Sequence, residues 1–180
     1  MDSVLGEARQ SIWDLQWKSL RPVELTEVLK QKVKQNFESQ MIHYPIEAFG
    51  PPCELIPEVA HSLGFIIREA WVNARRHAGP TEIRTELHYG PTQFLLTVSD
   101  NGKGMNVGNE ARVAGKWGVA GMRQRALKIK ANLTISSRPG EGTTIEISMD
   151  SANAYARVPA RSKFTSLFRV SRWRAWNREQ

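Results

Sequence analysis

Residues 68–78 read Arg-Glu-Ala-Trp-Val-Asn-Ala-Arg-Arg-His-Ala and close a long amphipathic segment that begins at Pro57. Proline suits the first turn of a helix, and Gly79-Pro80 is a strong stop signal. Apolar residues recur between these limits at the spacing of one helical face, at Val59, Leu63, Ile66, Ile67, Ala70 and Ala74. The spacing predicts a helix from Pro57 to about Ala78. Glu69 and Asn73 then lie one turn apart on the same face, and His77 extends the row by another turn.

Segments of alternating polar and apolar residues surround this helix and predict strands. One covers residues 42–48. Two more, 83–89 and 94–98, flank Gly90-Pro91 and predict a hairpin. A helix over about 119–130 and strands over 133–137 and 143–149 complete the series. Mostly hairpin-linked strands with helices grouped between them predict an α+β sandwich.

The two ends of the chain differ from this central region. Leu25, Val28, Leu29, Val33 and Phe37 share one helical face, which predicts a linker helix within residues 21–38. Residues 3–20 have the composition of the end of a longer helix, which Arg21-Pro22 breaks. From residue 151 the periodicity weakens, so we expect residues 151–180 to form a basic, flexible tail.

Composition excludes several classes of protein. With 41% hydrophobic and 24% charged residues among 180, the chain is not disordered throughout. A single cysteine, Cys53, excludes a disulfide framework and a multi-cysteine metal site within the chain. No apolar run approaches the ~18–20 residues that span a bilayer, and no secretory signal is visible. The formal net charge is +7, but residues 151–180 hold seven basic residues against Glu179 alone. Any polyanion partner is therefore expected at the tail, and nucleic acid is not expected as a partner of the body.

Four short segments carry residue types suited to chemistry, and each also has a structural interpretation. An amide oxygen at Asn73 suits Mg²⁺, and a carboxylate at Glu69 could accept a proton, although both also fit the polar face of a helix. Residues 100–105, Asp-Asn-Gly-Lys-Gly-Met, favour a turn, but ionised Asp100 could also accept a hydrogen bond from an adenine amine. Glycines in 115–121 before a helix favour phosphate binding or a mobile loop. Residues 140–144, Gly-Glu-Gly-Thr-Thr, fit a hairpin or place a hydroxyl near a base.

Together, and in this order, the four segments resemble the ATP-binding domain shared by gyrase, mismatch-repair, chaperone and histidine-kinase ATPases. Residues 68–78 resemble its N box, 100–105 its G1 box, 117–126 its G2 box, and 140–143 its final glycine-threonine element. The details Asn-Ala-x-Arg-His-Ala and Gly-Met-Arg-x-Arg-Ala are similar to sensor histidine kinases of the nitrate-sensor and lipid-sensor type. The resemblance covers about residues 39–149, and residues 7–15 are similar to the end of a dimerisation helix in these kinases.

The resemblance implies the Bergerat fold: a two-layer α/β sandwich with a mixed β-sheet and an ATP lid. With the periodicity of the two ends, we expect domains at 1–20 (end of a dimerisation helix), 21–38 (linker helix), 39–150 (ATP-binding domain) and 151–180 (basic tail, which has no counterpart in the family motifs). Glu69 would orient or polarise the attacking group, Asn73 would bind Mg²⁺ on the phosphates, and Asp100 would hold the adenine amine. The remaining ATP-binding positions that it implies are Arg76, His77, Gly102, Gly104, Met105, Gly118, Val119, Gly121, Met122 and Thr143.

The implied reaction moves the γ-phosphoryl group of Mg-ATP to a histidine on a dimerisation domain, and then to a response regulator receiver domain. His43, His61, His77 and His88 do not lie in the setting of an acceptor, so the acceptor is expected outside this chain. The location is expected to be cytoplasmic, with membrane contact only through other parts of a parent protein or through the tail. Two alternatives remain open: an anti-sigma-type serine kinase of the same fold and a non-catalytic ATP-binding interaction module.

Overall fold

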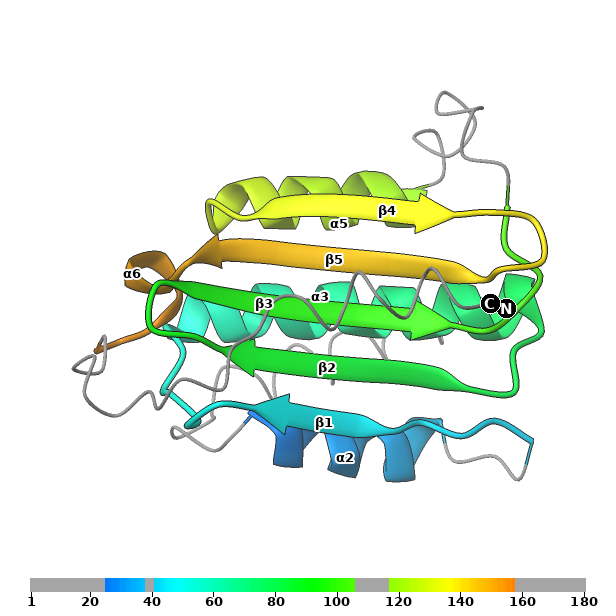
Figure 1. Cartoon of the computed structure of the whole chain (residues 1–180), viewed down its shortest axis with the longest axis horizontal. Coiled ribbons are helices and arrows are strands. Elements are labelled where there is room, and N and C mark those ends of the chain that lie inside the picture. Colours follow the sequence, from blue (N-terminus) through cyan, green and yellow to red (C-terminus); the bar gives the residue numbers. More distant parts are fainter. Residues whose placement is uncertain (1–24, 38–40, 106–116, 158–180) are drawn as a thin grey trace, which may run out of the picture.

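Five strands form one mixed sheet in the order β1-β2-β3-β5-β4 (Figure 1). The computed structural model describes residues 25–37, 41–105 and 117–157. Strand β1 is parallel to β2, and every other neighbouring pair is antiparallel. The strands are β1 (Ile46–Phe49), β2 (Ile83–Tyr89), β3 (Gln93–Asp100), β4 (Asn132–Ser137) and β5 (Thr143–Asp150). The five predicted strands are confirmed, although β1 is shorter than the alternation at 42–48 suggested.

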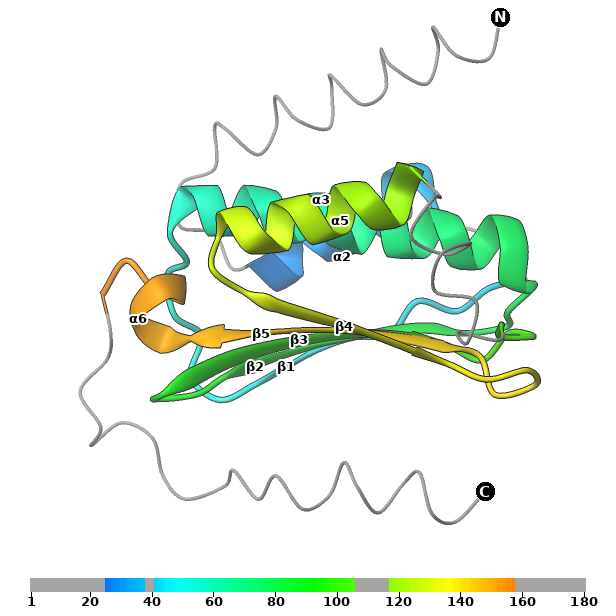
Figure 2. The same ribbon diagram turned by 90° about the horizontal axis from the view of Figure 1, so that it is seen from above.

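All three long helices cover the same face of the sheet, which gives the predicted two layers (Figure 2). They are α2 (Leu25–Asn36), α3 (Pro57–Asn73) and α5 (Trp117–Lys128). Helix α3 continues without a break into a π-helical turn, η1 (Ala74–Ala78), and Gly79 ends it in the left-handed conformation with φ 61°. The helix predicted over 57–78 is therefore confirmed, with a wider last turn.

The core lies between the helices and the sheet. Alternate residues of β2 are buried from Ile83 to Tyr89, as the alternating sequence predicts. Trp71 of α3 is completely buried, and its indole Nε1 donates a 3.0 Å hydrogen bond to Thr85 Oγ1 on β2. This bond satisfies the one polar atom of a large buried side chain and fixes α3 on the sheet.

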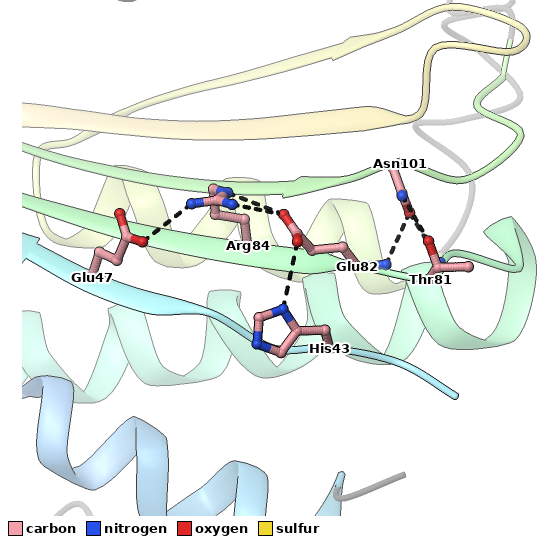
Figure 3. A network of polar contacts seen from close by, with 6 residues as sticks. All are labelled: His43, Glu47, Thr81, Glu82, Arg84 and Asn101. Carbon is pink, nitrogen blue, oxygen red and sulfur yellow. Dashed lines mark hydrogen bonds and ion pairs between the residues drawn. The ribbon is translucent and has the colours of Figure 1, made fainter. Parts of the chain in front are cut away.

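A polar network across β1 and β2 joins the loop before β2 to the loop after β3 (Figure 3). Asn101 Oδ1 accepts hydrogen bonds of 3.0 Å from the amides of Thr81 and Glu82, and Asn101 Nδ2 donates to Thr81 Oγ1 at 2.8 Å. Arg84 on β2 forms ion pairs with Glu82 and Glu47. Exposed ion pairs contribute little stability, but the amide contacts of Asn101 fix where the chain leaves β3.

Helix α2 belongs to the helical layer of the fold. Its predicted apolar face is buried, with Leu29 completely inaccessible and Leu25, Val28 and Phe37 almost so. The ring of Phe37 packs edge-on against Trp71, with 5.2 Å between the ring centroids. The segment expected to link two domains therefore contributes to the core.

The packed fold continues past residue 150, into the segment expected to be flexible. Residues 151–154 form a short helix, α6 (Ser151–Ala154), and Tyr155 is 3% exposed. The Tyr155 hydroxyl donates to Gly90 O at 3.1 Å, and the amide of Ala156 donates to Glu54 O at 2.9 Å. The expected dimerisation-helix end, residues 106–116 and the tail beyond residue 157 lie outside the described residues. Across the ranges that are described, no helix has the length and apolarity needed to cross a bilayer.

Candidate functional site

A cavity of about 350 Å³ opens at one end of the sandwich. This is the end at which β3 ends and β5 begins, which is on the right in Figure 1. Four parts of the chain meet there: the end of α3 with η1, the end of β3 with the following loop, the beginning of α5, and the facing ends of β4 and β5. Its lining includes ten of the twelve predicted ATP-binding residues, which are Asn73, Arg76, His77, Asp100, Gly104, Met105, Gly118, Val119, Met122 and Thr143. The structure thus brings together residues from all four predicted segments.

Three predicted site residues do not line the cavity. Glu69 lies one turn before Asn73, Gly102 is buried beneath the loop, and Gly121 faces Phe65. Eight lining residues were not predicted: Ala70, Ala74, Ala78, Ile83, Val98, Lys103, Ile135 and Ile145. Seven of these are apolar. In the sequence they follow the same alternating or helical spacing as core residues, so the sequence does not distinguish them from residues that fill the core. Lys103 lay inside a predicted segment, and its long cationic side chain was the available signal.

Asp100 is the last residue of β3 and lies directly across from Thr143, the first residue of β5. Its Oδ1 atom accepts a 2.9 Å hydrogen bond from the amide of Gly102. Burial raises the pKa of the Asp100 carboxyl above its usual value, and hydrogen bonds from the amides of Gly102 and Thr143 act against this shift. A half-buried carboxylate at an otherwise apolar end of a cavity can accept hydrogen bonds from a ligand amine.

Ser137, at the end of β4, was not predicted and connects three elements around Asp100 and Thr143. Its Oγ accepts from the amide of Met105 at 2.8 Å and donates to Gly142 O at 2.8 Å. It also lies 3.0 Å from Thr143 Oγ1. Nothing in its local sequence distinguishes it from the neighbouring serine, because the contacts depend on the pairing of β4 with β5.

Other residues of the cavity lining carry amide and cationic groups. Asn73 Nδ2 donates to Glu69 Oε1 at 3.4 Å, which directs the Asn73 amide oxygen away from that carboxylate. Arg76 and His77 lie on the π-helical turn and are exposed. Such turns are rare and are often found at functional sites. The lining of the cavity therefore combines hydrogen-bond acceptors, apolar side chains and cationic side chains.

Close backbone approaches explain two glycines of the loop that follows β3. A Cβ on Gly102 would meet the Cβ of Ala78 at 2.5 Å, and the next amide, that of Lys103, donates to Ala78 O at 3.0 Å. Gly104 has φ +60°, and a Cβ there would collide with the carbonyl oxygen of Arg138. The glycines thus let the loop pack between the end of α3 and the β4–β5 turn, which shapes the wall of the cavity.

Helix α5 begins beside the catalytic candidate Glu69. A Cβ on Gly118 would overlap the Glu69 carboxylate, so the absence of a side chain there makes room for it. One turn later, a Cβ on Gly121 would lie 3.6 Å from Phe65, which is an ordinary contact. Arg125 stacks over the same ring at 3.7 Å from its centroid. The charge of Arg125 therefore lies along the contact between α3 and α5.

Comparisons with known proteins agree with this arrangement. Residues 58–153 match the family described as histidine kinase-, DNA gyrase B-, and HSP90-like ATPase. The chain is 31% identical to the signal transduction histidine-protein kinase/phosphatase DegS of Brevibacillus brevis over 147 residues, which are 82% of this chain and 38% of DegS. It is 40% identical to the sensor protein VraS of Staphylococcus aureus over 82 residues, which are 46% of this chain and 23% of VraS.

A solved structure shares the fold. The ATP binding domain of PrrB from Mycobacterium tuberculosis superposes with a TM-score of 0.58 at 19% identity, covering 72% of this chain and 96% of that domain. The chain therefore belongs to the histidine kinase-, DNA gyrase B-, and HSP90-like ATPase family, and its relatives are sensor histidine kinases. It corresponds to the ATP-binding catalytic domain of such a kinase and spans less than two fifths of the length of DegS.

Proposed function

We propose that this domain transfers the γ-phosphoryl group of Mg-ATP to a histidine on a dimerisation domain, for relay to the receiver domain of a response regulator. The supporting observation is that one cavity unites residues from four separate segments, among them acceptors and cations. Adenine presents an exocyclic amine to acceptors, and a triphosphate is an anion. A single nucleotide can therefore satisfy both kinds of group. We place the domain in the cytoplasm, where ATP and receiver domains are available.

Within this proposal, Asp100 accepts a hydrogen bond from the adenine amine, and Thr143 lies beside it. The apolar side chains of Ile83, Val98 and Ile145 provide contact for the faces of the base. Arg76 and Lys103 supply positive charge for the phosphates. The beginning of α5 borders the same cavity, and backbone amides at a helix N-terminus favour an anion.

The residues present fit a magnesium ion held mainly by the nucleotide. Within the described parts of the chain, no cluster of three or more acidic, histidine or cysteine residues could hold a metal. The Asn73 amide oxygen is a hard ligand at the phosphate end, and Mg²⁺ often keeps waters and takes its other ligands from phosphates. A bound Mg²⁺ would neutralise charge on the phosphates. A site with one protein ligand, Asn73, and the remaining ligands from phosphates and water fits the residues that line the cavity.

Glu69 is proposed to orient and deprotonate the attacking group. Its carboxylate contacts Asn73 and the beginning of α5, so its position depends on both helices. A base held next to the metal-binding side chain can accept a proton when an acceptor histidine approaches the γ-phosphate. Positioning and charge neutralisation provide most of the catalysis in such transfers.

The test supplies the acceptor in trans. A helical hairpin that bears an acceptor histidine followed by an acidic residue is incubated with this chain and labelled ATP. Acid-labile phosphate should appear on the hairpin and not on this chain. Of its four histidines, only His77 lines the cavity. As one of the residues proposed to cradle the phosphates, it is expected to lie beside the phosphate chain and not in line with the γ-phosphorus.

Glu69→Gln is the informative variant, because it preserves shape and removes charge. It should lower the rate of transfer by about 10²–10⁴-fold, the typical contribution of a general base, and leave ATP affinity unchanged. The hairpin with its histidine replaced by alanine is the control. Acid-stable phosphoserine in place of phosphohistidine, or robust labelling of His77 itself, would contradict the proposal.

A further inference from the structure

The hydrogen bonds of Ser137 determine which way the Thr143 hydroxyl points. A serine hydroxyl has one proton and two lone pairs. The amide of Met105 can only donate and Gly142 O can only accept, and both lie 2.8 Å from Ser137 Oγ. The serine proton is therefore directed to Gly142 O. The 3.0 Å contact with Thr143 Oγ1 must then use the Thr143 proton, with Ser137 as the acceptor.

As a consequence, Thr143 offers only lone pairs to the cavity that it lines. Asp100, its direct cross-strand partner, also offers only lone pairs when it is ionised. Directly opposed residues on one face of an antiparallel pair have Cβ atoms about 4.5–5.5 Å apart, so the two acceptors can reach one ligand group. This end of the cavity thus has two adjacent acceptors.

The backbone donors of the adjoining loop are almost all engaged within the protein. The amides of Asn101, Gly102, Lys103 and Met105 donate to Glu82 O, Asp100 Oδ1, Ala78 O and Ser137 Oγ. The Thr143 amide donates to the Asp100 carboxylate. A ligand group that needs a donor therefore finds few at this end, whereas an amine finds two acceptors.

We infer that Ser137 is a specificity-determining residue, which selects adenine over guanine by holding the Thr143 hydroxyl as a hydrogen-bond acceptor. This inference rests on the proposed function, because it assigns the acceptor end to the base. Adenine carries a donor amine at the position where guanine carries an acceptor oxygen. Guanine would place that oxygen against Asp100 and Thr143, where no proton is available.

The experiment measures the dissociation constants of ATP and GTP by calorimetry for the full 180-residue chain and its variants. Wild type should bind ATP and discriminate strongly against GTP. In Ser137→Ala, the Thr143 hydroxyl is free to rotate and donate to the guanine oxygen. ATP should bind more weakly, GTP should bind more tightly, and the ratio should fall by about tenfold, which is the scale of one hydrogen bond.

Three further variants separate this role from a structural one. Ser137→Thr keeps the hydroxyl and should retain the wild-type ratio. Ser136→Ala changes the exposed neighbour on β4 and should alter neither affinity. Thr143→Val keeps the shape of the side chain and removes the acceptor, so ATP should bind more weakly and GTP should not bind more tightly. In the Ser137→Ala, Thr143→Val double variant, the gain of GTP should be absent.

Equal weakening of ATP and GTP by Ser137→Ala would show that the serine only supports the β4–β5 turn, and would overturn the inference. An unchanged ratio would do the same. If Ser137→Ala does not fold, Thr143→Val tests the inference. An unchanged ratio of ATP to GTP affinity in that variant would show that the Thr143 hydroxyl has no part in base selection, and would overturn the inference. Failure of wild type to bind either nucleotide would instead reject the proposed function.

Discussion

Asp100 illustrates how one residue serves binding at the expense of stability. Because burial raises its pKa in the folded protein, the carboxyl favours folding most when it is protonated. This contribution is present below the unfolded pKa and is lost as the pH rises through the folded pKa. At neutral pH the buried carboxylate is therefore a cost to the nucleotide-free protein, and it is retained because an ionised acceptor is useful to the ligand.

Asp100→Asn should weaken ATP binding by about 10- to 100-fold, because a donor then faces the adenine amine and a buried group is left unpaired. The same variant should raise the free energy of unfolding of the nucleotide-free protein at pH 7, measured by urea denaturation.

In wild type, ADP affinity should fall as the pH drops through the pKa of Asp100, which is raised above the usual value of 3.8. The variant, titrated with the same nucleotide, corrects for protonation of the ligand. A wild-type affinity that does not fall as the pH approaches the usual value of 3.8 would contradict this assignment.

At the scale of elements, Gly118 and Gly121 of α5 belong to one motif but differ in their surroundings. Gly121 has room for a methyl group 3.6 Å from Phe65, so Gly121→Ala should stabilise the protein by about 0.5–1 kcal/mol through helix propensity. Nucleotide affinity should not change. The measurement is the midpoint of urea unfolding together with the dissociation constant of ATP.

Gly118→Ala makes the same chemical change one turn earlier and is the matched comparison. The added methyl group would displace the Glu69 carboxylate from Asn73, so phosphoryl transfer to the supplied hairpin should slow while Gly121→Ala leaves it intact. Identical transfer rates for the two variants would show that the contact between Gly118 and Glu69 has no functional role.

Most elements of this fold could be predicted because each has a local signal. Pro57 and Gly79 bound the long helix, and alternation identifies β2, β3 and β5. The widening of the last turn of α3 into a π-helix has no such signal, because it is a change of hydrogen-bond register within one continuous amphipathic pattern. The same is true of α2, whose periodicity gave its apolar face but not the surface on which it packs.

The site was predictable as a set of segments and not as a geometry. The resemblance of the four segments to a known ATP-binding domain identified ten lining positions. Ile135 and Ile145 were missed because inward-facing strand residues look alike whether they line a cavity or fill a core. The role of Ser137 depends on the β4–β5 register, which places it opposite Thr143, and sequence alone does not fix that register.

At the scale of the whole molecule, Tyr155 closes the end of the sandwich that lies opposite the cavity. Its ring packs against Tyr89 and Phe94, with centroid distances of 5.4 Å between these two and 6.3 Å from Tyr155 to each. Tyr155→Ala should lower the free energy of unfolding by about 3–5 kcal/mol, as for other buried aromatic residues. Tyr155→Phe should cost about 1 kcal/mol, since only the bond to Gly90 O is lost.

ATP affinity of the folded Tyr155→Phe protein should equal that of wild type, because the substitution lies at the far end of the sheet. Thermal and urea unfolding of both variants, with ATP titration of the folded protein, check these expectations. Unchanged stability of Tyr155→Ala would show that the fold does not depend on residues beyond β5.

The pairing of β3 with β5 also sets the order in which the molecule can assemble. The central strand β3 can pair with its hairpin partner β2 as soon as both are synthesised. Its other neighbour, β5, follows α5 and β4 in the chain and is synthesised later. Such non-local pairing is slow to close, because a long loop must be ordered first. Asp100 and Thr143 meet only in that last step. During synthesis, nucleotide therefore cannot act as a template for early folding, and the ability to bind a base should arise only when the sheet is complete.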